Sequence, residues 1–274
     1  MNGAEDDLLA RVAAELNAWS SVEIRMTQTF PGNAATDRAV QRVEESYRER
    51  EDGRRSLDRK IFYGDGNGFH ETGFFDGAKS YYVKYEPSAW ETRQRSITIG
   101  ASFLHEGPGQ DERPWPLRSF YAGTIPIHEV LKGTTDARLV APLGRPCATF
   151  AADRLPWSKS VQDLVYLIDE QDHVPLRIVS YVDQAAKAAD RPVWDWSALR
   201  IDHIQGHAVV VDSETLRYHA RDGSLLHQTR FQVNHIVFDP KFADTDFKPV
   251  FEPGITVFDT LTKREYTTPV VGGR

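Results

Sequence analysis

Residues 6–30 read DDLLARVAAELNAWSSVEIRMTQTF, and the spacing of apolar residues changes within this stretch. In its first half an apolar residue recurs every three or four positions, which predicts an amphipathic helix over about residues 5–19. In its second half apolar and polar residues alternate, with Gln28 as the one polar residue in the apolar phase before Phe30, which predicts a half-buried strand. The stretch therefore indicates a fold in which a helix packs on a sheet.

The rest of the chain is mostly alternating segments separated by turn residues. Two long strands at 40–50 and 55–63 flank Glu51-Asp52-Gly53, and Asp76-Gly77 and Asp222-Gly223 mark further hairpins. Other strands are expected near 81–85, 97–103, 137–143, 147–152, 164–169, 175–183 and from 199, with one short helix at 127–131. Strands joined by short turns pair antiparallel, so we expect a mainly β (α+β) fold. Its form would be a curved antiparallel half β-barrel, with the N-terminal helix and the short helix covering the concave face.

No repeat or change of composition divides the sequence. Residues 1–274 are therefore expected to form a single domain, with 267–274 as a flexible tail. The stretch LHEGPGQDERPWPLR at 104–118 is rich in Pro, Gly and charged residues, which predicts a mobile loop. Together with the 127–131 helix, this loop would serve as a lid over the concave face.

Composition excludes several classes of protein. The 274 residues contain 33 Lys and Arg against 40 Asp and Glu, a formal charge of −7, which counts against nucleic acid as a partner. Basic residues between positions 48 and 60 are interleaved with acidic ones, so we interpret them as a solvated strand face. No apolar run reaches the roughly 18–20 residues of a membrane-spanning helix. Cys147 is the single cysteine, so an intramolecular disulfide is excluded.

Several short phrases in the second half of the chain occur in a recognisable order. They are Gly144-Arg145-Pro146-Cys147, Tyr166-Leu167-Ile168-Asp169, Pro175-Leu176-Arg177-Ile178 and the run FKPVFEPGITVFD at 247–259. This order, with the opening helix and strand, resembles the LolA-like proteins, the outer-membrane lipoprotein-sorting superfamily, and especially its divergent branch in planctomycete-type bacteria. The resemblance extends over nearly the whole chain.

The resemblance implies a half-open antiparallel barrel that binds acyl chains of lipids or lipoproteins on an apolar concave face. It also implies a monomer that meets a membrane or envelope protein transiently, in the periplasm or elsewhere outside the cytoplasm. The first 17 residues lack the basic and apolar regions of a signal peptide, so a cytoplasmic location stays open.

Candidate ligand-binding residues come from the apolar faces of the clearest strands and from the end of the first helix. Aromatic side chains on a half-barrel can either fill the core or line a cavity, and both roles stay open. The candidates for a hydrophobic cavity are Trp19, Val22, Ile24, Met26, Phe30, Tyr81, Val83, Tyr85, Ile97, Ile99 and Phe103.

Chemistry at histidine or cysteine is not favoured by the spacing. His203 and His207 stand four residues apart in a strand-like pattern, a span of about 13 Å, so they cannot share a metal ion unless Gly206 folds them together. Cys147 lies in an alternating strand, where a free cysteine usually acts as a small apolar residue. We therefore predict no catalytic residue, no metal and no cofactor.

The sequence thus predicts a binding or carrier protein for a lipidic or lipoprotein acyl ligand, and not an enzyme. Two alternatives stay open. One is an envelope sensor or regulatory interaction protein with a LolA-like domain, and the other is a hydrolase with an unrecognised pair of carboxylates.

Overall fold

The computed structural model describes residues 3–31, 39–86, 88, 92–101, 113–122, 124–131, 139–152 and 163–269. Its contacts divide the chain into two compact units, each assembled from separate stretches. Unit 1 comprises Met1–Trp19, Gln28–Gly32 and Pro108–Asn234, and unit 2 comprises Ser20–Thr27, Asn33–Gly107 and His235–Arg274. At two points the chain passes from one unit to the other within a strand, namely in β1 (Ser21–Thr29) and in β14 (Leu225–Phe238).

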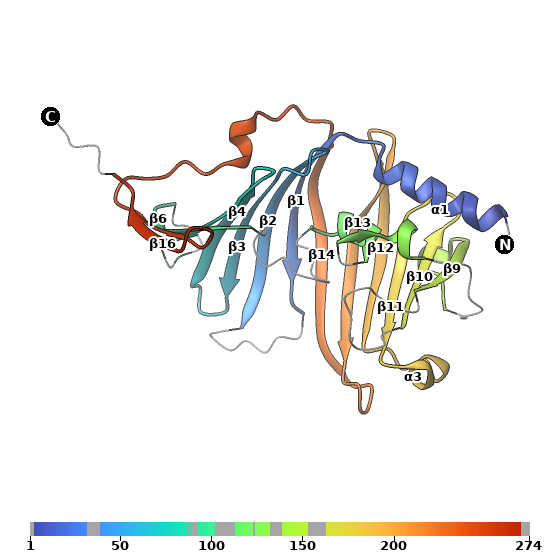
Figure 1. The fold of residues 1–274 in the computed structure, drawn as a ribbon. Coiled ribbons are helices and arrows are strands. Elements are labelled where there is room, and N and C mark those ends of the chain that lie inside the picture. The colour runs from blue at the N-terminus through green and yellow to red at the C-terminus, as the bar shows by residue number, and fades with distance from the viewer. Residues whose placement is uncertain are drawn as a thin grey trace. The chain divides into compact units, whose positions relative to one another are not determined.

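Unit 1 contains an antiparallel sheet in which the strands from β9 to β14 are neighbours in both sequence and space (Figure 1). Before β14 these strands are β9 (Cys147–Ala152), β10 (Asp163–Asp169), β11 (Pro175–Tyr181), β12 (Trp194–Ile204) and β13 (His207–Tyr218). The helices are α1 (Gly3–Leu16), α2 (Ile127–Val130) and α3 (Gln184–Ala188), with 3-10 turns η1 (Leu117–Phe120) and η2 (Pro142–Gly144). A separate ribbon pairs β7 (Tyr121–Ala122) with β8 (Ile125–Pro126).

One face of the unit 1 sheet carries an apolar row that crosses four strands. Cross-strand neighbours in this row are at most 3% exposed: Phe150, Tyr166, Ile178 and Trp196. Leu8 and Val12 of α1 and Ile127 of α2 belong to the same buried cluster. The apolar stripe of the first helix is therefore what fixes that helix to the sheet.

Unit 2 contains a second series of neighbouring strands in the order β1, β2, β3, β4, β5, β6, β15 and β16. After β1 they are β2 (Val40–Arg50), β3 (Arg55–Tyr63), β4 (Gly68–Phe75), β5 (Ser80–Tyr85), β6 (Gln94–Gly100), β15 (Thr256–Asp259) and β16 (Arg264–Thr267). The pairs from β2 to β6 are antiparallel. At the edge β15 runs parallel to β6, with Val257 opposite Ile97. Unit 2 also contains the 3-10 turn η3 (Asp244–Phe247), which precedes β15 in the chain.

The mainly β, largely antiparallel architecture with an N-terminal helix is confirmed, and β2 and β3 have the predicted limits. The parallel pair of β6 and β15 was not expected. It arises because β15 reaches β6 through a long connection from β14, and only adjacent hairpin strands are obliged to run antiparallel.

Other boundaries differ for local reasons. A strand near 137–143 is wrong for its described part, because Pro142 opens a 3-10 turn in which Leu143 and Gly144 have positive φ. Thr267 pairs with Thr256, and Thr268 is 6% exposed, so ordered chain continues into the expected tail. The single-domain assignment stays a prediction. Among the described residues, no helix has the length and apolar character needed to cross a membrane.

Leu176→Ala should lower the free energy of unfolding by about 2–5 kcal/mol, because Leu176 is fully buried in the unit 1 core and its removal leaves a cavity. Leu199→Ala on β12 is the matched control, since Leu199 is 43% exposed and should cost at most about 0.5 kcal/mol. Urea unfolding followed by circular dichroism measures both. Equal losses for the two variants would contradict the assigned faces of the sheet.

Candidate functional site

Candidate cavity residues of β5 and β6 come together on one face of the unit 2 sheet. Val83 lies opposite Ile97, and Tyr81 lies opposite Ile99. Phe74 of β4 pairs with Tyr81 and extends the same surface. Val83 and Ile97 are fully buried, and Ile99 is 7% exposed. We call the surface formed by these five residues the strap face.

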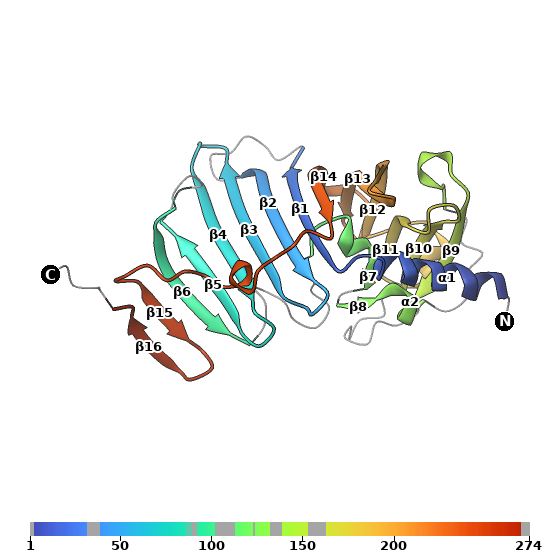
Figure 2. The same ribbon diagram turned by 90° about the horizontal axis from the view of Figure 1, so that it is seen from above.

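The strap face is covered by the chain between β14 and β15, residues 240–255, which we call the strap. Figure 2 shows this segment crossing in front of β2 to β5. Ile255 of the strap is buried in the same cluster as Val83 and Ile97, and Phe251 packs against the cluster with its ring 6.3 Å from that of Tyr81. The cover is thus irregular chain, not a second sheet or a long helix.

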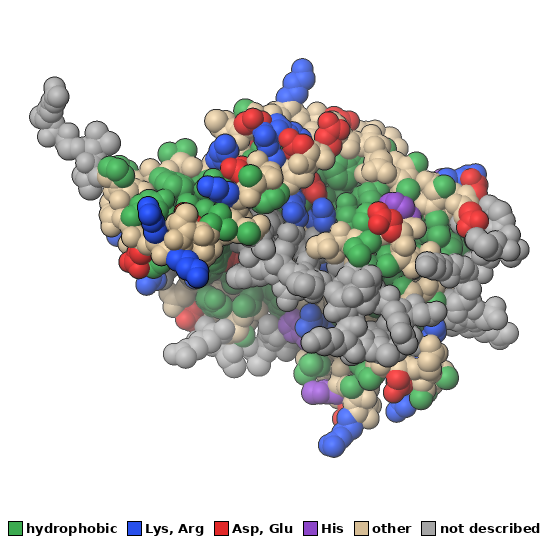
Figure 3. Space-filling model, viewed as in Figure 1, with side chains coloured by type: hydrophobic (Ala, Val, Ile, Leu, Met, Phe, Trp, Pro, Cys, Tyr) green, Lys and Arg blue, Asp and Glu red, His purple; other side chains and the backbone are tan. Residues whose placement is uncertain are grey.

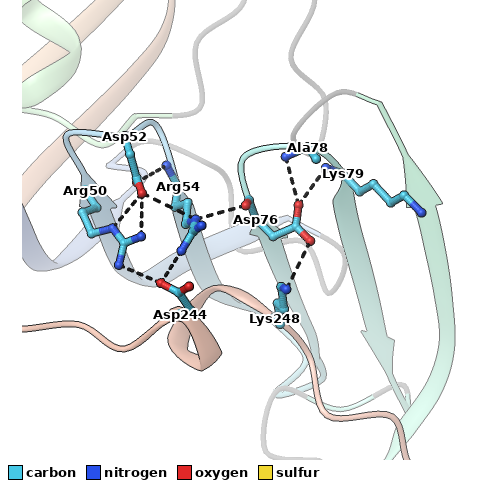
Figure 4. A network of polar contacts seen from close by, with 8 residues as sticks. All are labelled: Arg50, Asp52, Arg54, Asp76, Ala78, Lys79, Asp244 and Lys248. Atoms are coloured by element: carbon cyan, nitrogen blue, oxygen red, sulfur yellow. Dashed lines mark hydrogen bonds and ion pairs between the residues drawn. The ribbon is translucent and has the colours of Figure 1, made fainter.

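Ion pairs fix the strap to two hairpin turns (Figure 4). Asp244 lies between two guanidinium groups: its carboxylate is 3.0 Å from Nη1 of Arg50 and also pairs with Arg54. Farther along, Nζ of Lys248 is 3.8 Å from Oδ2 of Asp76. Figure 3 shows acidic and basic side chains intermixed where Figure 1 draws the strap. These anchors are polar and solvent-accessible, in contrast to the apolar contacts beneath.

Gln94 at the start of β6 provides a third anchor. Its Nε2 donates to the carbonyl of Val250 at 2.6 Å, and its Oε1 accepts from the backbone N–H of Glu252 at 3.1 Å. The backbone N–H of Gln94 donates in turn to the Glu252 carboxylate at 3.1 Å. Three hydrogen bonds therefore replace the strand pairing that this part of the strap lacks.

The carboxylates of the anchors keep their charge at neutral pH. Hydrogen bonding from Arg50 lowers the pKa of Asp244 below its ordinary value. Burial alone would raise the pKa of Asp76, but hydrogen bonds from the backbone N–H groups of Lys79 and Ala78 outweigh burial and lower it. A lowered pKa in the folded state stabilises the fold above the ordinary pKa. That contribution disappears only as the pH falls through the lowered value.

The candidates of β1 lie on the other face of the unit 2 sheet. Arg48 shares a cross-strand row with Phe74, so its side chain lies on the strap face. Its Nε is 3.2 Å from the carboxylate of Glu23 on the neighbouring β1, which places Glu23 on that face too. Side chains alternate along a strand, so the residues on either side of Glu23 point the opposite way. These opposite-face residues, each at most 2% exposed, are Val22, Ile24 and Met26.

The expectation that the β1 and β5 candidates line one surface is therefore wrong. Alternation in the sequence decides which residues of one strand share a face, but it does not relate the faces of strands that are several pairings apart. Whether either set binds a ligand stays a proposal.

The opposite face also holds buried charges, and we expected those of β2 and β3 to be solvated. Glu45 and Glu71 are each 5% exposed and share the guanidinium of Arg59, at 2.7 and 3.2 Å. Tyr82 donates a further hydrogen bond to Glu71. The interpretation of the charges on β2 and β3 as a solvated face is thus wrong for Glu45 and Arg59, whereas Glu71 belongs to β4. The missed signal was that Glu45 alternates in phase with Val43 and Tyr47, which are also buried.

The remaining candidates do not join the strap face in one group. Tyr85 lies at its polar end, with its ring stacked on His70 at 4.0 Å and its hydroxyl 3.2 Å from that of Thr72. Trp19 and Phe30 are half-buried residues of unit 1, and the Phe30 ring lies 5.6 Å from that of His227. Phe103 lies outside the described residues.

The expected mobile loop at 104–118 is wrong for its described part. Trp115 is 7% exposed and Leu117 is 4% exposed, and both are packed in unit 1. The Trp115 ring stacks on that of Trp196 at 4.7 Å. Pro, Gly and charge predicted mobility, but the aromatic ring has more apolar surface to bury than the local composition suggests. Residues 104–112 lie outside the described part.

In the β12–β13 hairpin His203 lies opposite Ala208, the residue after His207. The two histidines nevertheless contact different partners. His203 Nε2 is 3.1 Å from Asp172, and His207 Nδ1 is 3.9 Å from Glu15 on α1. Among the described residues, no three His, Cys, Asp or Glu side chains gather as metal ligands would.

Cys147 is half-buried, and burial raises the pKa of its thiol to about 11. Catalytic cysteines need the opposite shift, because the thiolate is the nucleophile. This environment favours the apolar role expected from its strand.

No protein-family model matches the chain, and no curated protein matches it. Solved structures do. A DUF1329 family protein from Desulfovibrio piger is 14% identical, covers 89% of this chain and 96% of its own, and has a TM-score of 0.49. A putative outer membrane lipoprotein-sorting protein domain from Vibrio parahaemolyticus is 10% identical, with coverage of 89% and 97% and a TM-score of 0.49. A LolA superfamily protein from Nitrosomonas europaea is 9% identical, with coverage of 88% and 97% and a TM-score of 0.39.

Alkylation of Cys147 by iodoacetamide should be slow at pH 8 and should keep accelerating up to about pH 11, the raised pKa of the thiol. In urea the same thiol should react at least about tenfold faster at pH 8, because its pKa returns to about 8.5. Mass spectrometry against time measures both rates. Rapid modification of the folded protein at pH 7 would show an activated cysteine and contradict this account.

Asp244→Asn should loosen the strap, because it removes the charge that pairs with Arg50 and Arg54. We expect roughly two- to fivefold faster hydrogen exchange at the amide of Lys248, which bonds to the Thr245 carbonyl. Asp222→Asn, in the β13–β14 turn of unit 1, is the control and should leave this amide unchanged. Unchanged exchange in both variants would remove Asp244 from the anchors.

Proposed function

We propose that the protein is a non-catalytic binding or carrier protein for a lipidic ligand, whose acyl chain enters between the strap and the strap face. The observation that carries this proposal is the nature of the cover. The apolar surface formed by the buried Val83, Ile97 and Ile99 and the half-buried Phe74 and Tyr81 is covered by irregular chain that polar contacts hold in place. Such a cover separates from the sheet without breaking a strand pairing of β2 to β6.

The energetics favour exchange of strap for ligand. Lifting the strap would expose Phe251 and Ile255, and an acyl chain would replace their contacts at about 0.8 kcal/mol per buried methylene. Solvent-accessible ion pairs such as those of Asp244 contribute little individually, so they oppose opening only weakly. Burial of eight methylenes would gain about 6 kcal/mol, against about 3–6 kcal/mol at most for exposing Phe251 and Ile255, so longer acyl chains should bind more tightly.

Location and partners follow the family resemblance. We propose an extracytoplasmic address and transient contact with a membrane or envelope protein that delivers or receives the ligand. The protein would act as a monomer, and transfer would require no catalytic step.

Phe74→Asp should weaken binding of a dansylated undecanoic acid at least about tenfold, because it places a carboxylate on the half-buried edge of the strap face. Phe258→Asp is the matched control: Phe258 is 41% exposed and lies next to the buried Val257 in β15, so binding should persist. Fluorescence titration measures affinity, and circular dichroism confirms that both variants fold. Equal binding by the wild type and folded Phe74→Asp would overturn the strap face as the site, and failure of the wild type to bind any acyl probe would overturn the carrier function.

A further inference from the structure

Two polar atoms in the core of unit 1 have no hydrogen-bond partner among the described residues. One is Nε1 of Trp196, a side chain that is fully buried, and the other is Oγ1 of Thr215, in a residue that is 7% exposed. A buried donor without an acceptor typically costs about 1–3 kcal/mol. Both atoms therefore lack a partner in the part of the chain that the structure describes.

The two groups are neighbours. Trp196 of β12 lies directly opposite Thr215 of β13, so their side chains share one face, with Cβ atoms about 4.5–5.5 Å apart. This is the face that carries the apolar row from Phe150 to Ile178. The unpartnered pair thus lies at the point where this apolar cross-strand row ends and the polar residue Thr215 follows.

Aromatic rings surround this pair. The Trp115 ring lies 4.7 Å from that of Trp196 at an interplanar angle of 14°, 6.2 Å from that of Trp194 at 28°, and 6.0 Å from that of Phe231. Trp194 and Phe231 are only half-buried and stand in the rows on either side of Trp196 and Thr215. The two unpartnered groups are therefore flanked by aromatic rings, of which Trp194 and Phe231 are half-buried.

We propose that Trp196 and Thr215 form a binding site for an uncharged, flat apolar molecule that carries a carbonyl oxygen. A carbonyl oxygen has two lone pairs, so it can accept from the indole N–H and from the threonine hydroxyl together. Its apolar body would lie against the half-buried rings of Trp194 and Phe231. An ionised group fits less well, because burial of its charge would need a partner that the row does not offer.

This site is independent of the proposed function. It lies in unit 1, whereas the strap face and the strap belong to unit 2. Either site can therefore fail its test without affecting the other.

The indole N–H of Trp196 gives a direct readout. The chain has six tryptophans, so the side-chain N–H of Trp196 is one of six signals in a proton–nitrogen correlation spectrum, assigned with Trp196→Phe. Acetophenone should move this signal downfield, because a new hydrogen bond forms. Isopropenylbenzene has nearly the same shape without the oxygen and should leave the proton unshifted. Equal responses to the two probes, or none, would overturn the proposal.

Thr215→Val separates ligand binding from a structural role. Valine has the shape of threonine without the unpartnered hydroxyl, so the variant should unfold at a higher urea concentration than the wild type, yet bind acetophenone about tenfold more weakly. Thr72→Val is the matched control in unit 2: Thr72 is 5% exposed, but its hydroxyl has partners in Asp58 and Tyr85. It should lose stability and keep acetophenone binding.

A buried water could also satisfy Trp196 and Thr215, and the same spectra decide this case. A cross-peak between the Trp196 indole proton and water in the free protein, unchanged by acetophenone, would overturn the ligand site. Undiminished acetophenone binding in folded Thr215→Val would do so as well.

Discussion

Side chains alternate along a strand, which gives a sheet two faces. In the sheet of unit 2 the apolar residues on both faces are buried. One face holds Val22, Ile24 and Met26, and the other holds Val83 and Ile97. A sheet whose two faces are both apolar must be covered twice. On the strap face the cover comes from the connection between β14 and β15, so the path of that connection, the parallel entry of β15 and the polar anchors all follow from the same requirement.

Charge is used differently on the two faces. On the strap face, accessible ion pairs hold the strap at the hairpin turns, where salt and solvent screen them. On the other face, Glu45 and Glu71 are buried around Arg59, where removal of one partner would leave an uncompensated charge in the interior. Weak anchors on one side and a buried charge network on the other suit a sheet that stays rigid while its cover moves. The Trp196–Thr215 pair of unit 1 adds a third arrangement, in which polar atoms are buried without any charge.

Much of the fold was predictable because its signals are local. The stripe of Leu8, Val12 and Leu16 predicted the first helix, and Glu51-Asp52-Gly53 located the hairpin of β2 and β3 within its observed limits. The candidate site was predicted only in part, since Tyr81, Val83, Ile97 and Ile99 meet on one surface. The role of the strap could not be predicted, because it depends on contacts such as Gln94 with Glu252, which are 158 residues apart. The burial of Trp115 was missed because a Pro-rich and charged segment does not reveal that one of its rings stacks in a core.

The central claim is that the strap leaves the strap face when a ligand enters, and a distance measurement across the two tests it most directly. Val250 of the strap is 84% exposed and Lys84 of β5 is exposed, so both accept a spin label as cysteines in a Cys147→Ser background. Double electron–electron resonance would then give the distance distribution between them without and with saturating dansylated undecanoic acid. The account predicts one short distance in the free protein and a second, longer distance that grows with bound acid. A single distance that stays unchanged while the acid is bound would contradict it.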